Sequence, residues 1–407
     1  MIKKYVVQRI TPLYHLQMMV HIILIILFTG GSLPAGADLT KADPAETERF
    51  TIETAVDNLN KPWGMDFLPN GRVIITEKGG NLWVADLRSG KKTKILMDKP
   101  DIAVKGQGGL LDVAIDPQFS DKKPWVYLSY SAEGKGADGD GLYGTEVGRG
   151  KLQDNKLVEF ETLFVAQPKK TSSYHFGSRL VFDQDHHLYI TLGDRGDRHE
   201  AQNTSNHLGG VIRLYRDGGV PKDNPFVANK KVPDEIFSYG HRNIQGAFFD
   251  VKTKRLWMTE HGPQGGDELN IVKPGLNYGW PKITYGKEYG SGRDIGDGVK
   301  GLGIEPPLWE WTPSIAPSGL TVYHGDMFPE WEGDILAGAL KYQLLSRLRF
   351  DSGKVVEKER LFEGDFGRIR DVAVDKHGAI YMLTDDRKGQ LLKVKSASKV
   401  KQEGKIN

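Results

Sequence analysis

Six copies of one short pattern run along this chain after about residue 48. Each copy has a β-rich apolar run, a turn with Asp or Asn and a nearby Gly, and a second apolar run. Runs such as 73–76 and 188–191 are rich in β-branched and aromatic residues and are too short for buried helices. The copies begin at Gly64, Leu111, Ser178, Gly246, Ser318 and Ile369, and the fifth is the loosest.

The spacing of the copies predicts the fold class. Two strands joined by a hairpin recur at roughly 50 to 70 residues, with room for further strands between them. Such units are typical of propeller blades rather than of a sandwich. No linker rich in Pro, Gly or Ser divides them. We therefore expect an all-β fold, a six-bladed β-propeller, in one closed domain over residues 48–396, followed by a polar tail at 397–407.

The N-terminus has the layout of a secretory signal. Three basic residues are followed by an apolar run at 18–28 and by small residues around position 36. The run is short for a membrane span, so the pattern favours export over a retained anchor. We expect a signal peptide at 1–37, a linker at 38–47, and a periplasmic or secreted mature protein without a membrane span.

Charge and cysteine content exclude some classes of function. The chain has 55 Lys and Arg against 53 Asp and Glu, a net charge of +2, which provides no broad positive field for nucleic acid. It has no cysteine, which excludes disulfides and thiolate metal sites. We expect no nucleic-acid partner.

A histidine and an aspartate flank the third copy. His175 stands just before it and Asp194 closes it, 19 positions later. A hairpin returns the chain to the end where it began, so the two side chains are expected to meet. A carboxylate that accepts from one imidazole nitrogen makes the other nitrogen a better base. From the residues alone, the pair is either a general base with its partner or a structural hydrogen bond.

Polar and cationic side chains recur beside other copies. Gln107 lies in a Gly-rich turn before the second copy. Such a turn either lets the backbone approach a ligand closely or is a plain turn without a ligand. Arg242 precedes the fourth copy, and Lys341 follows a strand of the fifth. Arg368 and Arg370 precede the sixth, on one face of an extended segment. Taken singly, each of these cations is a surface charge. Taken together, they occupy equivalent places in different blades and favour an anionic ligand, because positive charges that converge without an anion destabilise the fold.

An acidic, Gly-rich segment, EHGPQGGDELN, leads to the motif NYGWP. Asp267, Glu268 and Tyr278, with carbonyl groups at Gly262 and Pro263, offer the oxygen ligands that calcium prefers. The segment lacks the regular acid spacing of an EF-hand loop. Its composition fits a calcium site and a solvated acidic turn equally well.

The chain resembles the soluble sugar dehydrogenases that depend on pyrroloquinoline quinone (PQQ), the bacterial aldose sugar dehydrogenases in particular. The resemblance covers about residues 62–395. It rests on motifs in the family's order: GQGGLLDVA, HFGSRLVFD, LGDRG, GHRNIQG, EHGPQGGDELN, NYGWP, GALK and RIRDV. It implies a six-bladed propeller with PQQ over the axis, calcium beside the cofactor, and oxidation of an aldose at C1 to the lactone. Electrons would pass to an external acceptor, a quinone, cytochrome or dye, and the protein would be a monomer or homodimer.

The resemblance also implies roles for single residues. His175 falls on the catalytic base, Asp194 on its orienting partner, and Arg242 on a residue that stabilises charge growing on the quinone. The implied cofactor-binding residues are Gln107, Arg242, Asn243, Lys341, Arg368 and Arg370, with Ser314 added through an alignment shifted by one position. The implied calcium ligands are the carbonyls of Gly262 and Pro263, with further ligation by Tyr278 and Glu268.

Two positions depart from the glucose-oxidising members. Tyr174 stands where those enzymes have an acid, and His199 replaces an amide that touches the sugar. The physiological sugar is therefore left open. Two other classes also remain: a calcium-dependent hydrolase such as a lactonase, which needs no set of anion-binding cations, and a non-catalytic propeller that binds carbohydrate or protein.

Overall fold

The structure, a computed structural model, describes residues 48–136 and 141–398. Strands dominate this part of the chain, joined by loops and by the short 3-10 helices η2 (Arg198–Gln202) and η3 (Pro329–Trp331). Within it, no helix has the length and apolar character needed to cross a membrane. The expected signal peptide at 1–37, the linker at 38–47 and most of the tail at 397–407 lie outside the described residues.

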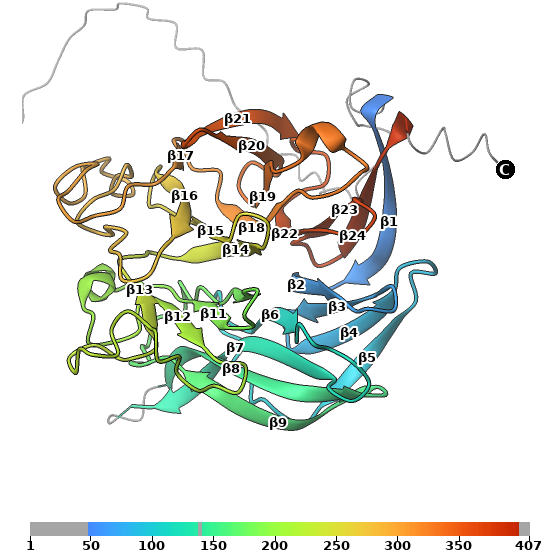
Figure 1. Ribbon diagram of the computed structural model, residues 1–407, viewed down its shortest axis with the longest axis horizontal. Coiled ribbons are helices and arrows are strands. Elements are labelled where there is room, and N and C mark those ends of the chain that lie inside the picture. Colours follow the sequence, from blue (N-terminus) through green and yellow to red (C-terminus); the bar gives the residue numbers. More distant parts are fainter. Residues whose placement is uncertain (1–47, 137–140, 399–407) are drawn as a thin grey trace, which may run out of the picture. The chain divides into compact units, whose positions relative to one another are not determined.

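The described strands form five sheets, four of four strands and one of eight (Figure 1). The eight-stranded sheet has the order β2-β3-β4-β5-β9-β8-β7-β6. Its strands are β2 (Pro62–Phe67), β3 (Arg72–Glu77), β4 (Asn81–Asp86), β5 (Lys92–Met97), β6 (Leu110–Ile115), β7 (Trp125–Lys135), β8 (Gly141–Gln153) and β9 (Lys156–Val165).

Three of the other sheets use consecutive strands in chain order. They consist of β10 (Leu180–Phe182), β11 (Leu188–Thr191), β12 (Val211–Leu214) and β13 (Ile236–Ser238); of β14 (Ile244–Asp250), β15 (Arg255–Glu260), β16 (Asp267–Val272) and β17 (Trp309–Trp311); and of β18 (Pro317–Val322), β19 (Ile335–Ala339), β20 (Leu345–Asp351) and β21 (Lys354–Leu361).

The last sheet joins the two ends of the described chain. Its order is β1-β24-β23-β22, so the first strand pairs with the last. The pairing is antiparallel and runs from Phe50 opposite Ser396 to Leu59 opposite Gly389. Its strands are β1 (Phe50–Leu59), β22 (Ile369–Val374), β23 (Ile380–Thr384) and β24 (Gly389–Ser396).

The first strands of the six copies, called the inner strands below, contact one another in a closed circuit. β2 lies against β6 and β22, β10 lies against β6 and β14, and β18 lies against β14 and β22. Each predicted copy coincides with such an inner strand and the strand after it, from β2 and β3 through to β22 and β23. Sheets repeated about an axis are the arrangement of a β-propeller. The prediction of an all-β fold is confirmed.

The second strand of a copy is covered on both faces, as β3 illustrates. Val73 and Ile75 of β3 pack into one apolar cluster, and Ile74 between them packs into another. All three are fully buried. This explains why the repeated runs are continuously apolar instead of alternating. Burial of each such side chain contributes about 1.5–3 kcal/mol to folding.

One buried cation ties the inner strands together. The Arg179 guanidinium donates to Asp112 at 3.1 Å and to Asp371 at 2.9 Å. It also donates to the carbonyl oxygen atoms of Gln245 at 2.7 Å and Arg370 at 3.0 Å. Burial raises the pKa of the Asp112 carboxyl to about 7, although the Arg179 charge opposes that rise. Arg179 thus connects three of the inner strands, β6, β14 and β22.

Candidate active site

The predicted pair of His175 and Asp194 is formed. His175 lies in the loop before β10 and Asp194 follows β11, and the Nδ1 atom of the imidazole is 2.6 Å from Oδ1 of the carboxylate. Asp194 also accepts the backbone N–H of Gly196 at 2.7 Å and the indole N–H of Trp280 at 2.8 Å. Burial raises the pKa of Asp194, but the hydrogen bond from His175 and the other donors bring it below its usual value. An ionised Asp194 fixes the proton on Nδ1 and leaves Nε2 of His175 unprotonated.

The charge state of His175 follows from its surroundings. Burial lowers the pKa of the imidazole, the hydrogen bond to Asp194 raises it, and the charge of Arg242 lowers it, with a net decrease. The ring is therefore neutral at pH 7. A neutral imidazole with its tautomer fixed by a carboxylate has the properties of a general base.

Gln107 and Asn243 hold the histidine segment from neighbouring units. The Gln107 side-chain oxygen accepts the backbone N–H of His175 at 2.8 Å. The Asn243 side-chain oxygen accepts the backbone N–H of Gly177 at 3.1 Å. These contacts place both predicted residues beside His175.

Arg242 is brought to the pair by the backbone. Its carbonyl oxygen accepts the N–H of Asp194 at 2.9 Å. Its guanidinium donates to the carbonyl oxygen of His261 at 3.1 Å and lies 5.4 Å from the centre of the Trp280 ring. Burial and the nearby Arg242 charge lower the pKa of His261 to about 3, so His261 is neutral.

A cavity of about 470 Å³ opens beside these groups, within the size range of small-molecule sites. Four of its lining residues were predicted from the sequence: Gln107, Asn243, Arg368 and Arg370. Seven polar or aromatic lining residues were not predicted: Lys61, Trp63, Lys78, Phe176, Gln245, His261 and Asp385.

The cavity lining carries an excess of positive charge. Arg370 donates to Asp385 at 2.7 Å and Arg368 donates to the same oxygen at 3.3 Å, so both side chains lie on one face as predicted. Lys61 and Lys78 also line the cavity, which gives four cations to one carboxylate and a net charge of +3. Burial lowers the pKa of Lys78 and of Arg370, and the neighbouring cations add to that effect. The Nε atom of Arg370 is buried without a hydrogen-bond partner in the described chain. This lining fits a ligand with several negative charges.

The repeats contain a signal for the missed residues. Lys78 follows β3, His261 follows β15 and Asp385 follows β23. Asp194 lies three positions after the end of β11, close to the same place. The end of the second strand in each copy reaches the same edge of the fold, so aligning the copies with one another would have identified all three.

Two predicted cofactor residues point elsewhere in this structure. The ammonium group of Lys341 lies 5.3 Å from the centre of the Tyr342 ring, and the residue does not line the cavity. Ser314 is buried; its hydroxyl donates to Asp267 at 2.9 Å and accepts the N–H of Gly265 at 3.1 Å. The Ser314 hydroxyl thus belongs to the hydrogen-bond network of the acidic, Gly-rich segment at 260–270.

The first predicted pair of calcium ligands lies in the loop after β15. Asp267 accepts the N–H of Gly262 at 2.8 Å and the N–H of Ala316 at 2.8 Å. The carbonyl oxygen of Pro263 accepts the hydroxyl of Tyr289 at 2.9 Å. A carbonyl oxygen has a second lone pair, so Pro263 keeps the capacity to bind a hard cation.

The second predicted pair lines a cavity of about 170 Å³. Burial strongly raises the pKa of Glu268, and the nearby Glu260 carboxylate raises it further. The Tyr278 hydroxyl donates to the Ile271 carbonyl at 2.8 Å and accepts the N–H of Lys273 at 2.9 Å. Crowded buried carboxyl groups of this kind fit an oxygen-coordinated cation, because a cation removes their repulsion.

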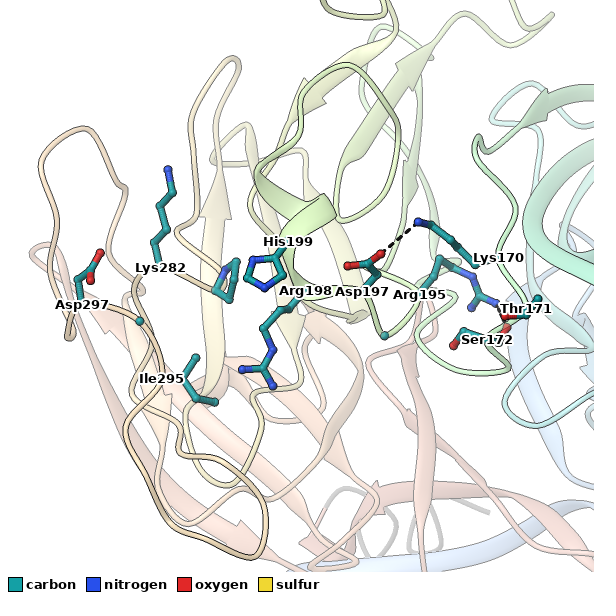
Figure 2. A pocket seen from close by; sticks show the side chains of 13 residues that line it. Lys170, Thr171, Ser172, Arg195, Asp197, Arg198, His199, Lys282, Ile295 and Asp297 are labelled. Atoms are coloured by element: carbon teal, nitrogen blue, oxygen red, sulfur yellow. Dashed lines mark hydrogen bonds and ion pairs between the residues drawn. The ribbon is translucent and has the colours of Figure 1, made fainter.

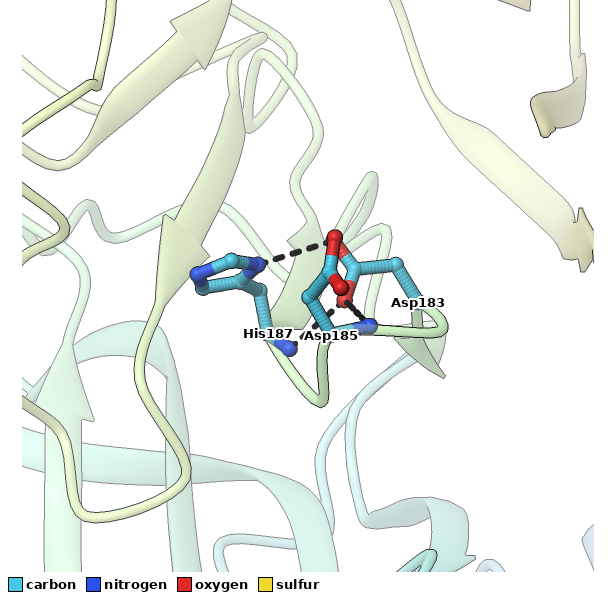
Figure 3. Close-up of side chains that lie close together, drawn as sticks. All are labelled: Asp183, Asp185 and His187. Carbon is cyan, nitrogen blue, oxygen red and sulfur yellow. Dashed lines mark hydrogen bonds and ion pairs between the residues drawn. The ribbon is translucent and has the colours of Figure 1, made fainter.

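A third group of possible metal ligands has a simpler explanation. Asp183, Asp185 and His187 gather in the β10–β11 turn (Figure 3). Asp183 accepts the backbone N–H groups of Asp185 at 2.9 Å and His187 at 2.8 Å. Asp116 and Asp375 cap the corresponding turns of other copies in the same way. The cluster is therefore the recurring turn of the repeat.

A larger cavity of about 700 Å³ adjoins the chain on both sides of the His175–Asp194 pair. Its lining comes from the segments just before His175, just after Asp194 and just after Trp280, and from residues 295–297 (Figure 2). His199, one of the two departures noted in the sequence, lines it. Arg198 also lines it, pairs with Glu288 at 2.5 Å and lies 5.6 Å from the centre of the Trp280 ring.

The sequence profile of the glucose/sorbosone dehydrogenases matches residues 59–393. The chain belongs to this family. The family predicted from the motifs is thereby confirmed, and with it the assignment to an enzyme class whose members oxidise sugars.

The relatives include characterised dehydrogenases. Aldose sugar dehydrogenase YliI of Escherichia coli is 42% identical over 88% of this chain and 95% of that protein. Quinoprotein glucose dehydrogenase B of Acinetobacter calcoaceticus is 28% identical over 84% of this chain and 86% of that protein.

Solved structures of the family share the fold. The apo-form of the E. coli soluble aldose sugar dehydrogenase is 41% identical and superposes with a TM-score of 0.80, covering 85% of this chain and 99% of that one. The PQQ-bound form of the Streptomyces coelicolor aldose sugar dehydrogenase is 26% identical with a TM-score of 0.70, covering 86% of this chain and 99% of that one. The family therefore includes a member that binds PQQ.

Proposed function

We propose that this protein is a PQQ- and calcium-dependent aldose dehydrogenase that oxidises the sugar at C1 to the lactone. The observation that carries the proposal is the net charge of +3 in the cavity lining beside a neutral His175 whose Nδ1 is held by Asp194. PQQ is a planar tricarboxylate, and its charge complements that excess. The PQQ-bound relative supports the choice of cofactor.

The fold in this proposal is a six-bladed propeller. In support, the eight-stranded sheet consists of two antiparallel halves whose strands pair with each other only through the short parallel pair of β5 and β9. Counting each half as a blade gives six units in the described chain, one for each sequence repeat. The inner strands of these units are the ones that contact in a closed circuit.

His175 acts as the general base. With its proton on Nδ1 and held by Asp194, it accepts the proton of the anomeric hydroxyl at Nε2 as hydride leaves C1. The aldose loses two electrons and two hydrogens and becomes the lactone. Removing the proton from the hydroxyl makes loss of hydride from the same carbon easier, so His175 promotes cleavage of the C1–H bond indirectly.

The surrounding residues bind and orient. When bound, PQQ supplies the two-electron acceptor. Arg242, held by the His261 carbonyl, places a fixed positive charge where negative charge grows during the reaction. Arg368, Arg370, Lys61 and Lys78 would hold the cofactor carboxylates, and the carbonyls of Gly262 and Pro263 would hold calcium. The 700 Å³ cavity next to His175 offers space for the part of the sugar that does not react.

The cell compartment belongs to the same proposal. The N-terminal pattern of basic residues, apolar run and small residues supports export to the periplasm or beyond. There the protein would pass electrons to an external quinone or cytochrome.

A reconstitution experiment tests the proposed function. Purified apo-protein is given PQQ with calcium, and reduction of an artificial dye is followed with a panel of aldoses. We expect sugar-dependent reduction only when PQQ and calcium are both present. Bound PQQ without any sugar-dependent reduction would refute the dehydrogenase and favour a binding protein, whereas lactone hydrolysis without PQQ would favour a hydrolase.

Replacing Arg370 by glutamine should weaken PQQ binding by about 10- to 100-fold, since a charge-assisted hydrogen bond to a buried group contributes about 1.5–3 kcal/mol. The measurement is the dissociation constant from PQQ titration of the apo-protein. Arg216→Gln is the matched control, because Arg216 forms a similar pair with Asp116 at 2.9 Å and does not line the cavity. Equal affinities of wild type and Arg370→Gln would contradict the proposed cofactor site.

Adding calcium to the apo-protein should raise its melting temperature. Binding to the folded state alone contributes about 2.7 kcal/mol at a hundredfold excess over Kd, and calcium would relieve the repulsion that raises the pKa of Glu268. Glu268→Gln should reduce the rise, and magnesium should replace calcium poorly. A melting temperature independent of calcium would exclude these residues as a site.

A further inference from the structure

Arg195, next to Asp194 in the chain, is a buried cation with unusual partners. Only 2% of its surface is exposed. Its guanidinium donates to the carbonyl oxygen of Tyr174 and, at 2.6 Å, to that of Ser172. Its Nε atom is buried without a hydrogen-bond partner among the residues that the structure describes. The charge is thus held by backbone dipoles and by no carboxylate hydrogen bond.

This arrangement is costly for the fold. Burial lowers the pKa of Arg195 to about 9, and only the nearby Asp194 charge opposes that decrease. The guanidinium carbon lies 3.4 Å from the centre of the Phe176 ring, so the ring covers the face of the cation. A lysine, with a compact ammonium group, would satisfy these contacts less completely.

The partners of Arg195 bracket the general base. Ser172 and Tyr174 precede His175, and Phe176 follows it. His175 itself has a left-handed backbone conformation, with φ of 56°. A non-Gly residue keeps such a conformation only when its surroundings hold it there. Arg195 contacts the chain on both sides of that residue (Figure 2 shows Arg195 beside Ser172).

We propose that Arg195 is a positioning residue that locks the segment 172–176 and so keeps the imidazole of His175 on Asp194 in the orientation needed for proton removal. The inference rests on the proposed role of His175 as the base. Arg195 also borders the 700 Å³ cavity, but with 2% of its surface exposed it is assigned a role through His175 and not through the substrate.

The charge of Arg195 has a second effect on the same group. The charged groups that influence His175 are Asp194, which raises its pKa, and Arg242 and Arg195, which lower it; His261 is neutral. Loss of the Arg195 charge therefore raises the pKa of His175. Below that pKa the imidazole is protonated and cannot accept a proton, so the acid limb of the rate profile moves to higher pH.

Arg195→Gln and Arg195→Lys in the full-length holoenzyme test the proposal. For Arg195→Gln we expect kcat to fall by about 10- to 100-fold, as for a misplaced catalytic group, while KM and PQQ affinity stay within about threefold. The acid limb should move to higher pH. Arg195→Lys keeps the charge but not the planar fork, so its acid limb should stay in place while kcat remains reduced. If Arg195→Gln fails to fold, Arg195→Lys alone decides, and a wild-type kcat in it overturns the proposal.

Arg213→Gln is the matched control. Arg213 is also buried, with a buried Nε atom that lacks a hydrogen-bond partner among the described atoms, and it pairs with Asp223 at 3.1 Å. The Arg213→Gln variant should be less stable than the wild type, and the acid limb of its pH–rate profile should not shift. Loss of PQQ affinity together with kcat in Arg195→Gln would indicate general damage and overturn the proposal.

A titration of the apo-protein separates this inference from the proposed function. NMR of ring-labelled histidine, assigned with His175→Ala, reports the pKa of His175 without cofactor or sugar. We expect a higher pKa in Arg195→Gln than in wild type; an unchanged value overturns the effect of the Arg195 charge on His175. If the value moves but wild-type holoenzyme oxidises no aldose, that effect holds and the dehydrogenase assignment fails. The positioning role itself is decided by the kcat of Arg195→Lys.

Discussion

Replacing His175 by alanine should lower kcat by about 10³-fold, within the range expected for loss of a general base. PQQ affinity should change by less than about threefold, because the cations that line the cavity stay in place. Steady-state dye reduction gives kcat, and PQQ titration of the apo-protein gives the affinity. The reason is geometric: the imidazole Nδ1 is 2.6 Å from Asp194, which leaves Nε2 as the proton acceptor.

His207 provides the matched control. It also pairs with a carboxylate, Glu235, at 3.1 Å, but its other ring nitrogen accepts the backbone N–H of Gln167 at 2.9 Å, so neither nitrogen is available as a base. His207→Ala should keep the wild-type kcat once the folded fraction is taken into account. A His175→Ala protein that loses PQQ, or that turns over sugar at the wild-type rate, would show that His175 is not the base.

Replacing Arg179 by methionine should reduce the free energy of unfolding by about 3–5 kcal/mol, because it leaves buried carboxylates without their partner. Arg179 pairs with Asp112 at 3.1 Å and with Asp371 at 2.9 Å. Urea denaturation at pH 8 measures the loss. Arg149→Met, which breaks the more exposed pair with Glu161, should lose about 1 kcal/mol or less.

The loss in Arg179→Met should depend on pH. A carboxyl group whose pKa is raised by folding favours the folded state below its unfolded pKa, and that contribution is lost as the pH rises to the folded pKa. For Asp112 in wild type this window runs from the model-peptide value of about 4 to about 7. Without the Arg179 charge the folded pKa rises further, so the variant should be least destabilised near pH 4 and most near pH 8. Adding Asp112→Asn and Asp371→Asn should restore part of the stability at pH 8; a pH-independent loss would contradict this explanation.

The repeat was predictable because each hairpin is local in sequence. The second strands of the copies, such as β3 and β11, are short apolar runs bounded by turns, and both occur where the pattern placed them. The pairing of β1 with β24 was not predicted, since it joins residues more than 300 positions apart and neither strand has a local hairpin signal. The parallel contact of β5 with β9 was missed for the same reason.

The site was predictable where one hairpin determines it. His175 and Asp194 belong to one copy, so the return of the chain brings them together. The indole N–H of Trp280 reaches the same carboxylate from 86 positions away, and no local pattern encodes that distance. Side-chain direction is equally hidden: Lys341 is on the expected strand end, but its ammonium group lies over Tyr342.

The last strand to be synthesised, β24, pairs with the first, β1. β24 ends at Ser396 and its partner β1 begins at Phe50, so this sheet stays incomplete until nearly the whole chain has left the ribosome. A chain shortened before Gly389 would leave the edges of β1 and β23 without a neighbour, and such open edges recruit strands from other molecules. Removal of residues 389–407 should therefore lead to aggregation more readily than a cut in a long surface loop.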